Sequence, residues 1–131
     1  MKWVSKGKKK TYSIKRFFSG FVCAARGIIS AFKTEQNLLF DFVFAIFTIV
    51  FGIFLKLSTI EFVIVFLTIA LVISLELMNT AVEYVVDMAM PEIHPLAKLS
   101  KDISSGAVLF SAIVALVIGI IIYLPKVIAL F

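Results

Sequence analysis

The sequence contains one cysteine and one histidine among its 131 residues. A lone cysteine cannot form a disulfide within the chain, and these two residues cannot supply the cluster of Cys and His ligands that transition metals favour. Charged residues are also scarce, at 16% of the chain, whereas they make up about 25% of a typical soluble domain. Because 62% of the residues are hydrophobic, the composition excludes a water-soluble globule and predicts an integral membrane protein.

The few basic residues are concentrated near the N-terminus. Nine of the thirteen lysines and arginines fall within residues 1–33, and the positive-inside rule therefore predicts that this end stays in the cytoplasm. Residues 1–10 either form a solvated tail that only sets orientation or bind anionic lipid headgroups. No nucleic-acid partner is expected, because the tail shows no recognition motif.

Four apolar segments follow the basic tail. Segment 15–34 places phenylalanines on one side and arginine, serine and lysine on the other, which predicts an amphipathic helix on the membrane surface. Residues 38–57, 60–90 and 97–124 predict three membrane helices, since about 20 apolar residues span a bilayer. We expect one all-α membrane domain over residues 1–131, with a basic tail at 1–14 and the C-terminus outside.

Single residues predict where these helices end and on which side of the membrane their connections lie. The third membrane helix is expected to start near Pro95, to enter the membrane at about residue 103 and to end before Pro125. The connection near residues 56–61 should be short and outside, and the loop 88–101 should be inside. Cys23, in the surface helix, is interpreted as a small packing residue.

A polar stripe interrupts the second membrane helix. Its members fall within about 100° of one another on a helical wheel: Glu76, Asn79, Thr80, Glu83 and Asp87. A carboxylate at membrane depth costs at least about 2.5 kcal/mol, so the stripe predicts a catalytic or metal-binding site. The alternative is a cytoplasmic helix end whose acids meet water, an interpretation that suits Asp87 better than Glu76.

Spacing within the stripe favours a division of roles. Glu76 and Glu83 are separated by about 10 Å along the helix, so one can hold a metal ion while the other handles a proton. Hard oxygen ligands favour Mg²⁺ shared with substrate phosphates. Glu35 is a candidate for a further ligand if the surface helix continues that far; otherwise it is a helix-end residue at the interface.

The loop between the second and third membrane helices offers a phosphate partner. Lys98, Lys101, Asp102 and Ser105 share one helix face, and a lysine there can bind phosphate. The alternative is an ordinary positive-inside loop, and a single interfacial His94 is more often structural. No Walker A sequence, Gly-rich kinase loop or HRD-type loop is present. The residues alone fit a metal-dependent lipid enzyme, and they also fit a small proton-coupled transporter or channel.

The joint pattern, however, resembles the prokaryotic diacylglycerol kinase and undecaprenol kinase family. The resemblance covers about residues 16–124. It is carried by Glu76-x-x-Asn79-Thr80-Ala81-x-Glu83-x-x-x-Asp87, by His94, by Lys101-Asp102-x-x-Ser105-Gly106-Ala107-Val108-Leu109, and upstream by Arg16 and Ala31-Phe32-x-x-Glu35.

The resemblance implies a homotrimer with active sites between subunits at the cytoplasmic interface, where the γ-phosphate of ATP passes to a lipid hydroxyl. Glu76 would be the general base and Asn79 would position the base or substrate, while Glu35 and Glu83 would hold Mg²⁺. The implied nucleotide-binding set also includes these two glutamates together with Arg16, Asp87, Glu92, His94, Lys101 and Asp102. Cys23 replaces an aromatic residue of the best-known diacylglycerol kinases. The sequence of Leu77–Glu83 is more similar to the Gram-positive branch of the family, which favours undecaprenol over diacylglycerol as the lipid.

Overall fold

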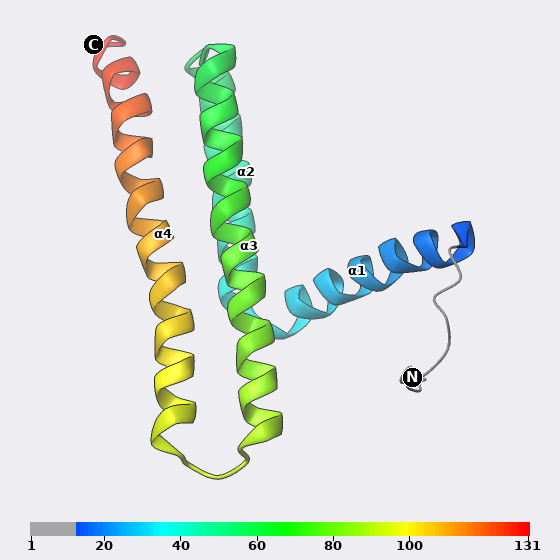
Figure 1. The fold of residues 1–131 in the computed structure, drawn as a ribbon. Coiled ribbons are helices and arrows are strands. Elements are labelled where there is room, and N and C mark those ends of the chain that lie inside the picture. Colours follow the sequence, from blue (N-terminus) through cyan, green and yellow to red (C-terminus); the bar gives the residue numbers. More distant parts are fainter. Residues whose placement is uncertain (1–12) are drawn as a thin grey trace.

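The computed structural model describes residues 13–131, which form four α-helices. They are α1 (Ile14–Thr34), α2 (Gln36–Phe54), α3 (Thr59–Ala89) and α4 (Pro95–Ile128). Helices α2, α3 and α4 stand side by side, and α1 extends sideways from the bundle (Figure 1). The last three helices are long and apolar enough to cross a membrane. The predicted all-α architecture is confirmed, whereas most of the predicted basic tail lies outside the described residues.

Helix α1 is amphipathic and almost wholly exposed. Its only buried residue is Ala31, close to the junction with α2, while Phe17 and Phe21 on its apolar side are more than 60% exposed. An apolar face that the bundle does not cover is what a helix lying in the membrane interface requires. Cys23 is exposed on this helix, so its interpretation as a packing residue is wrong for the single chain, because α1 projects away from the core.

The turn between α2 and α3 is short and well specified. At the end of α2, the Leu57 and Lys56 N–H groups donate to the carbonyl oxygens of Gly52 and Ile53. Lys56 has a φ of 54°, so the arrangement is a Schellman motif with lysine in the left-handed position. Ser58 and Glu61 then form a capping box that starts α3. The helix therefore ends at Phe54, before the predicted residue 57, since the chain needs those residues for the turn.

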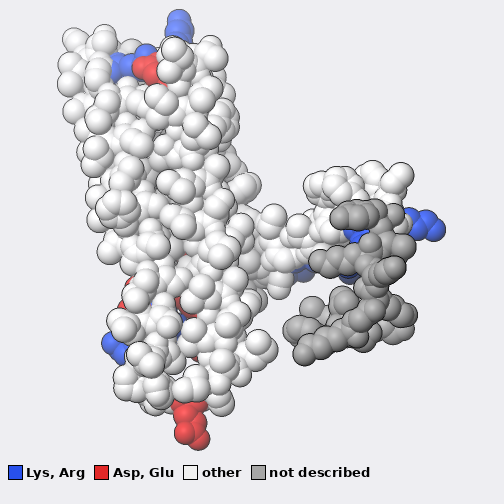
Figure 2. Space-filling view, viewed as in Figure 1, with Lys and Arg blue, Asp and Glu red and all other residues white. Residues whose placement is uncertain are grey.

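Helices α3 and α4 pair along most of their length. One ion pair joins Lys126 to Glu61 at 3.1 Å, and another joins Lys101 to Asp87. Figure 2 shows charged side chains near the two ends of the bundle, with an uncharged stretch of surface between them. At 1.5 Å per residue, the 31 residues of α3 extend about 46 Å, beyond the hydrocarbon core of about 30 Å. Part of α3 must therefore project from the membrane.

Helix α4 begins and ends differently from the sequence prediction. It starts at Pro95, as expected for proline in the first turn. At the other end it continues through Pro125 to Ile128, so the predicted end before Pro125 is wrong. Proline removes one N–H donor, but the Ala129 N–H still donates to the Pro125 carbonyl at 3.1 Å. The helix therefore survives the proline near its terminus.

A small apolar core closes the end of the bundle near this turn. Its buried residues are Leu55, Leu57, Val65 and Ile122. Gly52 lies against it: a Cβ atom at this position would lie 2.9 Å from the Tyr123 Oη and 3.2 Å from Leu57 and Phe62 side-chain atoms. The Tyr123 hydroxyl cannot retreat freely, because it donates a 2.8 Å hydrogen bond to the Thr48 carbonyl. The close approach of these helices therefore depends on glycine.

Gly52→Ala is expected to lower the free energy of unfolding by about 1–3 kcal/mol through overpacking. Gly20→Ala is the matched control, because a Cβ atom there meets nothing within 4 Å. Alanine at that helical position should be neutral or stabilise by up to about 1 kcal/mol. Thermal unfolding followed by circular dichroism in detergent micelles measures both variants, and an equal or higher midpoint for Gly52→Ala would contradict the packing argument.

Candidate active site

The site is centred on Glu76, in the middle of α3. Only 6% of this residue is exposed, although a carboxylate is rarely buried without a partner. Its backbone carbonyl accepts a 3.1 Å hydrogen bond from the Thr80 hydroxyl. The described residues form no hydrogen bond or ion pair with its side chain. A buried carboxylate of this kind is available for a ligand or a proton.

Three other carboxylates lie within electrostatic range of Glu76. Glu35, Asp41 and Glu83 all lie close enough to repel its charge. Asp41 is half-buried in α2 and was missed by the sequence analysis. The signal was nevertheless present, because Asp41 is the only acidic residue within the predicted span 38–57 and an acid at membrane depth is expensive. The predicted stripe on α3 is therefore one side of a larger acidic site shared with α2.

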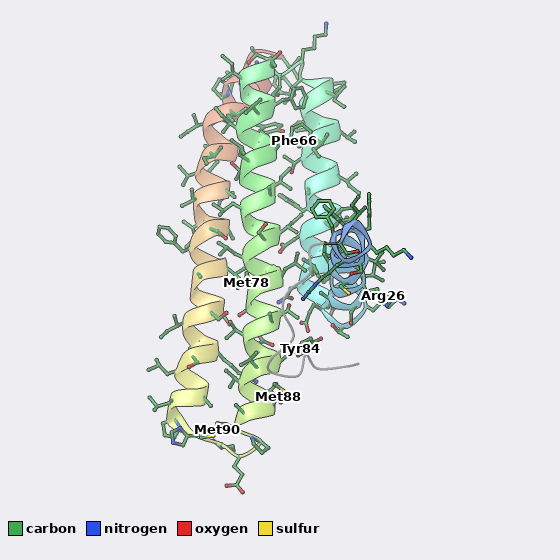
Figure 3. All side chains as sticks on the ribbon, turned by 45° about the vertical axis from the view of Figure 1, so that its right-hand side comes forward. Arg26, Phe66, Met78, Tyr84, Met88 and Met90 are labelled. Carbon is green, nitrogen blue, oxygen red and sulfur yellow. The ribbon has the colours of Figure 1, made fainter. Side chains whose placement is uncertain are left out.

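The first of these carboxylates reaches the site through a break between helices. Helix α1 ends at Thr34, and Glu35 has an extended backbone with φ −104° and ψ 109°. The condition that the surface helix continues to Glu35 is therefore not met, but the turn still brings its carboxylate near Glu76. A 2.8 Å hydrogen bond between the Thr34 and Tyr84 hydroxyls fixes this junction to α3. Figure 3 shows Tyr84 at the level where α1 joins the bundle.

The side chain of Asn79 is oriented by another residue of the polar stripe on α3. Its amide Nδ2 donates a 3.1 Å hydrogen bond to the Glu83 carboxylate one turn away. Its Oδ1 is buried and has no hydrogen-bond partner among the described residues. Buried acceptors are nearly always satisfied, so this oxygen is free to accept from a ligand hydroxyl or a metal-bound water.

Two ion pairs lie beyond the acidic site, toward the α3–α4 loop. Lys101 pairs with Asp87 across the two helices, and Lys98 pairs with Asp102 at 3.3 Å along α4. Lys101 precedes the part of α4 predicted to enter the membrane, and its hydrogen bond to Asp87 raises the pKa of the ammonium group. Lys101 therefore stays positively charged at neutral pH, as a phosphate-binding lysine must.

The remaining predicted residues are not gathered at Glu76. Arg16 is exposed in the first turn of α1, about 27 Å along the helix from Thr34. Glu92 is exposed in the α3–α4 loop. His94 caps α4 by accepting a 3.2 Å hydrogen bond from the Leu96 N–H at Nδ1, so the structural interpretation of this histidine has direct support.

The oxygen ligands at the site suit an Mg²⁺ ion that is bound partly by the protein and partly by nucleotide phosphates. Glu35, Glu83 and the unpartnered Asn79 oxygen are hard ligands of the kind that Mg²⁺ takes. Within residues 13–131, no three Asp, Glu, His or Cys side chains are close enough to hold a metal by themselves. Since Mg²⁺ usually combines one or two carboxylates with waters and nucleotide phosphates, the set fits an ion that arrives with a nucleotide.

Comparison with known proteins identifies the family. Residues 22–123 match the family described as prokaryotic diacylglycerol kinase. The chain belongs to this family. It is 44% identical over 113 residues to an undecaprenol kinase of Bacillus subtilis, covering 86% of this chain and 92% of that protein. It is 38% identical over 111 residues to a diacylglycerol kinase of Synechocystis, covering 84% of this chain and 63% of that protein.

A more distant relative spans less of the chain. A diacylglycerol kinase of Escherichia coli K12 is 32% identical over 92 residues, which cover 70% of this chain and 75% of that protein. Membership of the diacylglycerol kinase family confirms the predicted resemblance and the predicted enzyme class, a lipid kinase that uses ATP. The alternative of a transporter or channel loses its support, because the acidic stripe is accounted for within a kinase family.

Proposed function

We propose that this protein transfers the γ-phosphoryl group of Mg-ATP to the hydroxyl of undecaprenol, giving undecaprenyl phosphate and ADP. The observation that carries the proposal is the buried Glu76 carboxylate, which has no side-chain partner among the described residues and lies on an apolar membrane helix. The choice of lipid is supported by the 44% identity to an undecaprenol kinase. A diacylglycerol kinase is the second candidate, favoured by the relative at 38% identity.

In the proposed reaction, Glu76 accepts the proton of the lipid hydroxyl while the hydroxyl oxygen bonds to the γ-phosphorus. The bond from the γ-phosphorus to the bridging oxygen breaks, and ADP leaves with that electron pair. Glu76 then returns its proton to water. Mg²⁺, when held by Glu35 and Glu83, neutralises the phosphate charge, which is the main demand of phosphoryl transfer. Asn79, hydrogen-bonded to Glu83, positions the reacting hydroxyl.

The nucleotide is assigned to the part of the site nearer the α3–α4 loop. We propose that Lys101 and Asp102 contact it, with Asp87 holding Lys101 in place through their ion pair. Glu92 and His94 border this region on the loop side. Arg16 lies too far along α1 to reach Glu76 of its own chain. We propose that it contributes from the membrane surface of a neighbouring subunit in a homotrimer.

The proposed orientation follows from the same assignment. ATP is cytoplasmic, so the α3–α4 loop and the N-terminus face the cytoplasm of a cell membrane, and the α2–α3 turn and the C-terminus lie outside. The basic composition of residues 1–33 agrees with the positive-inside rule.

A side-by-side assay with purified protein in bilayers tests the function and the lipid. With Mg-ATP, we expect phosphorylation of undecaprenol to exceed that of diacylglycerol by at least about tenfold, the ratio that about 1.4 kcal/mol of differential binding gives. Radiolabelled phosphate in the extracted lipid is the measurement. A reversed ratio would favour the second candidate, and labelling of neither lipid would contradict a lipid kinase.

A further inference from the structure

A single side-chain hydrogen bond joins α1 to the rest of the described chain. It connects the hydroxyls of Thr34, the last residue of α1, and Tyr84 of α3, which lie 2.8 Å apart. Within residues 13–131, no other side-chain hydrogen bond or ion pair links α1 to another helix. Tyr84 lies at the level where α1 joins the bundle (Figure 3). The bond is therefore the polar contact that ties the end of α1 to α3.

The direction of this bond follows from the protons available. The Thr34 hydroxyl already donates to two carbonyl oxygens of its own helix, at 3.2 Å to Ser30 and 3.3 Å to Ala31. A threonine hydroxyl has one proton to donate and two lone pairs that can accept. Tyr84 is therefore the donor and Thr34 the acceptor, so a phenylalanine in place of Tyr84 would remove the bond.

The two bonded residues are sequence neighbours of the two carboxylates assigned to Mg²⁺. Thr34 directly precedes Glu35, and Tyr84 directly follows Glu83. The backbone of Glu35 is attached to the same end of α1, because its N–H donates to the Ala31 carbonyl at 2.8 Å. A shift of this end of α1 relative to α3 would therefore change the spacing of Glu35 and Glu83.

Other contacts leave the position of α1 relative to α3 weakly defined. Helix α1 buries only Ala31. Its aromatic contact with another helix, the edge-to-face pair of Phe32 and Phe42 at 5.3 Å, is made with α2. Glu83, by contrast, is oriented within α3 by its hydrogen bond from Asn79. The spacing of the two carboxylates therefore depends on the contact between α1 and α3.

Tyr84 also has the position of an interfacial anchor, since tyrosines gather where membrane helices meet water. It is 49% exposed. An anchor needs only water or lipid headgroups as partners for its hydroxyl. The hydroxyl of Tyr84 instead contacts Thr34, which lies 50 residues earlier in the chain. This contact points to a role at the acidic site.

We propose that the Thr34–Tyr84 hydrogen bond sets the spacing of Glu35 and Glu83. Thr34 and Tyr84 are then positioning residues for the Mg²⁺ that accompanies the nucleotide. This inference rests on the proposed kinase function and its metal assignment, and it adds to them two residues that touch neither metal nor substrate. Because the bond lies at an exposed junction, its loss should weaken the metal site and leave the helix bundle folded.

The first test measures metal binding directly. With ADP and the full-length protein in detergent, the EPR signal of free Mn²⁺ gives the dissociation constant of an ion that takes the same oxygen ligands as Mg²⁺. Tyr84→Phe should raise this constant about threefold to tenfold, the value of one hydrogen bond. Tyr123→Phe is the matched control, because it removes another interhelical tyrosine bond of 2.8 Å, to the Thr48 carbonyl. It should leave Mn²⁺ affinity unchanged.

A double-mutant cycle then tests whether the two hydroxyls act as a pair. Thr34→Val removes the acceptor at nearly constant shape and should weaken Mn²⁺ binding as much as Tyr84→Phe. The double variant should be no weaker than either single variant, and Thr34→Ser, which keeps the hydroxyl, should bind like the wild type. In the kinase assay, Tyr84→Phe should raise the Mg²⁺ requirement by the same factor and leave the KM for undecaprenol unchanged.

Three results would contradict the proposal. Unchanged Mn²⁺ affinity in Tyr84→Phe would leave Tyr84 as an interfacial anchor. An equal loss in Tyr123→Phe would mean that the bond supports only the stability of the bundle. Additive losses in the double variant would show that the two hydroxyls act independently. A wild-type protein that binds Mn²⁺ with ADP but phosphorylates neither lipid would refute the proposed kinase function instead.

Discussion

Replacing Glu76 with glutamine is expected to slow ATP-dependent lipid phosphorylation by about 10²–10⁴-fold, the contribution of a general base. Glutamine keeps the shape of the side chain but cannot accept the hydroxyl proton. The buried position of Glu76 means that water cannot easily replace it. The initial rate of transfer from radiolabelled ATP to undecaprenol in vesicles measures the loss, which should appear in kcat rather than in the KM for Mg-ATP.

Glu61→Gln is the matched control for this experiment. It makes the same exchange on the same helix, but Glu61 lies at the opposite end, where it caps α3 and pairs with Lys126. Its activity should stay within about twofold of the wild type, since a surface ion pair is worth at most about 1 kcal/mol. Glu76→Gln should fold normally, because its carboxylate forms no hydrogen bond within the described chain. Full activity of Glu76→Gln would remove this residue from catalysis.

Local signals were sufficient to predict most of the fold. Apolar length located the three membrane helices, amphipathicity separated α1 from them, and Pro95 marked the start of α4. The errors lie at helix ends. The sequence does not reveal that Lys56 adopts the left-handed conformation which ends α2 early. Nor does it reveal that α4 tolerates Pro125 near its terminus.

The candidate site was predictable only along single helices. The wheel placed Glu76, Asn79 and Glu83 on one face, and a hydrogen bond between the last two follows from their spacing. Contacts between helices depend on register and on packing, which one sequence does not display. The pairing of Lys101 with Asp87 and the approach of Asp41 to Glu76 are of this kind. The direction of α1, which separates Arg16 from the acidic site, is another.

Glu83 carries the clearest prediction about metal dependence. Its carboxylate is half-buried and receives the Asn79 amide at 3.1 Å, so its orientation is fixed before any ligand arrives. Glu35, on the extended segment between α1 and α2, is its proposed partner in binding Mg²⁺. Two carboxylates with nucleotide phosphates and waters complete the octahedral set that Mg²⁺ demands.

Glu83→Gln is therefore expected to raise the Mg²⁺ concentration needed for half-maximal activity by at least about tenfold. Even the loss of a residue that only orients a metal ligand lowers metal affinity or activity by about 10–100-fold. An amide oxygen is a weaker ligand than a carboxylate, so high Mg²⁺ should restore part of the rate. Asp102→Asn is the comparison: Asp102 is exposed on α4 and pairs with Lys98, so its loss should alter nucleotide binding without this Mg²⁺ rescue. Titration of Mg²⁺ at saturating ATP separates the two variants. An unchanged Mg²⁺ requirement in Glu83→Gln would mean that the ion binds elsewhere, because removing the charge of a direct ligand must weaken the binding of the metal.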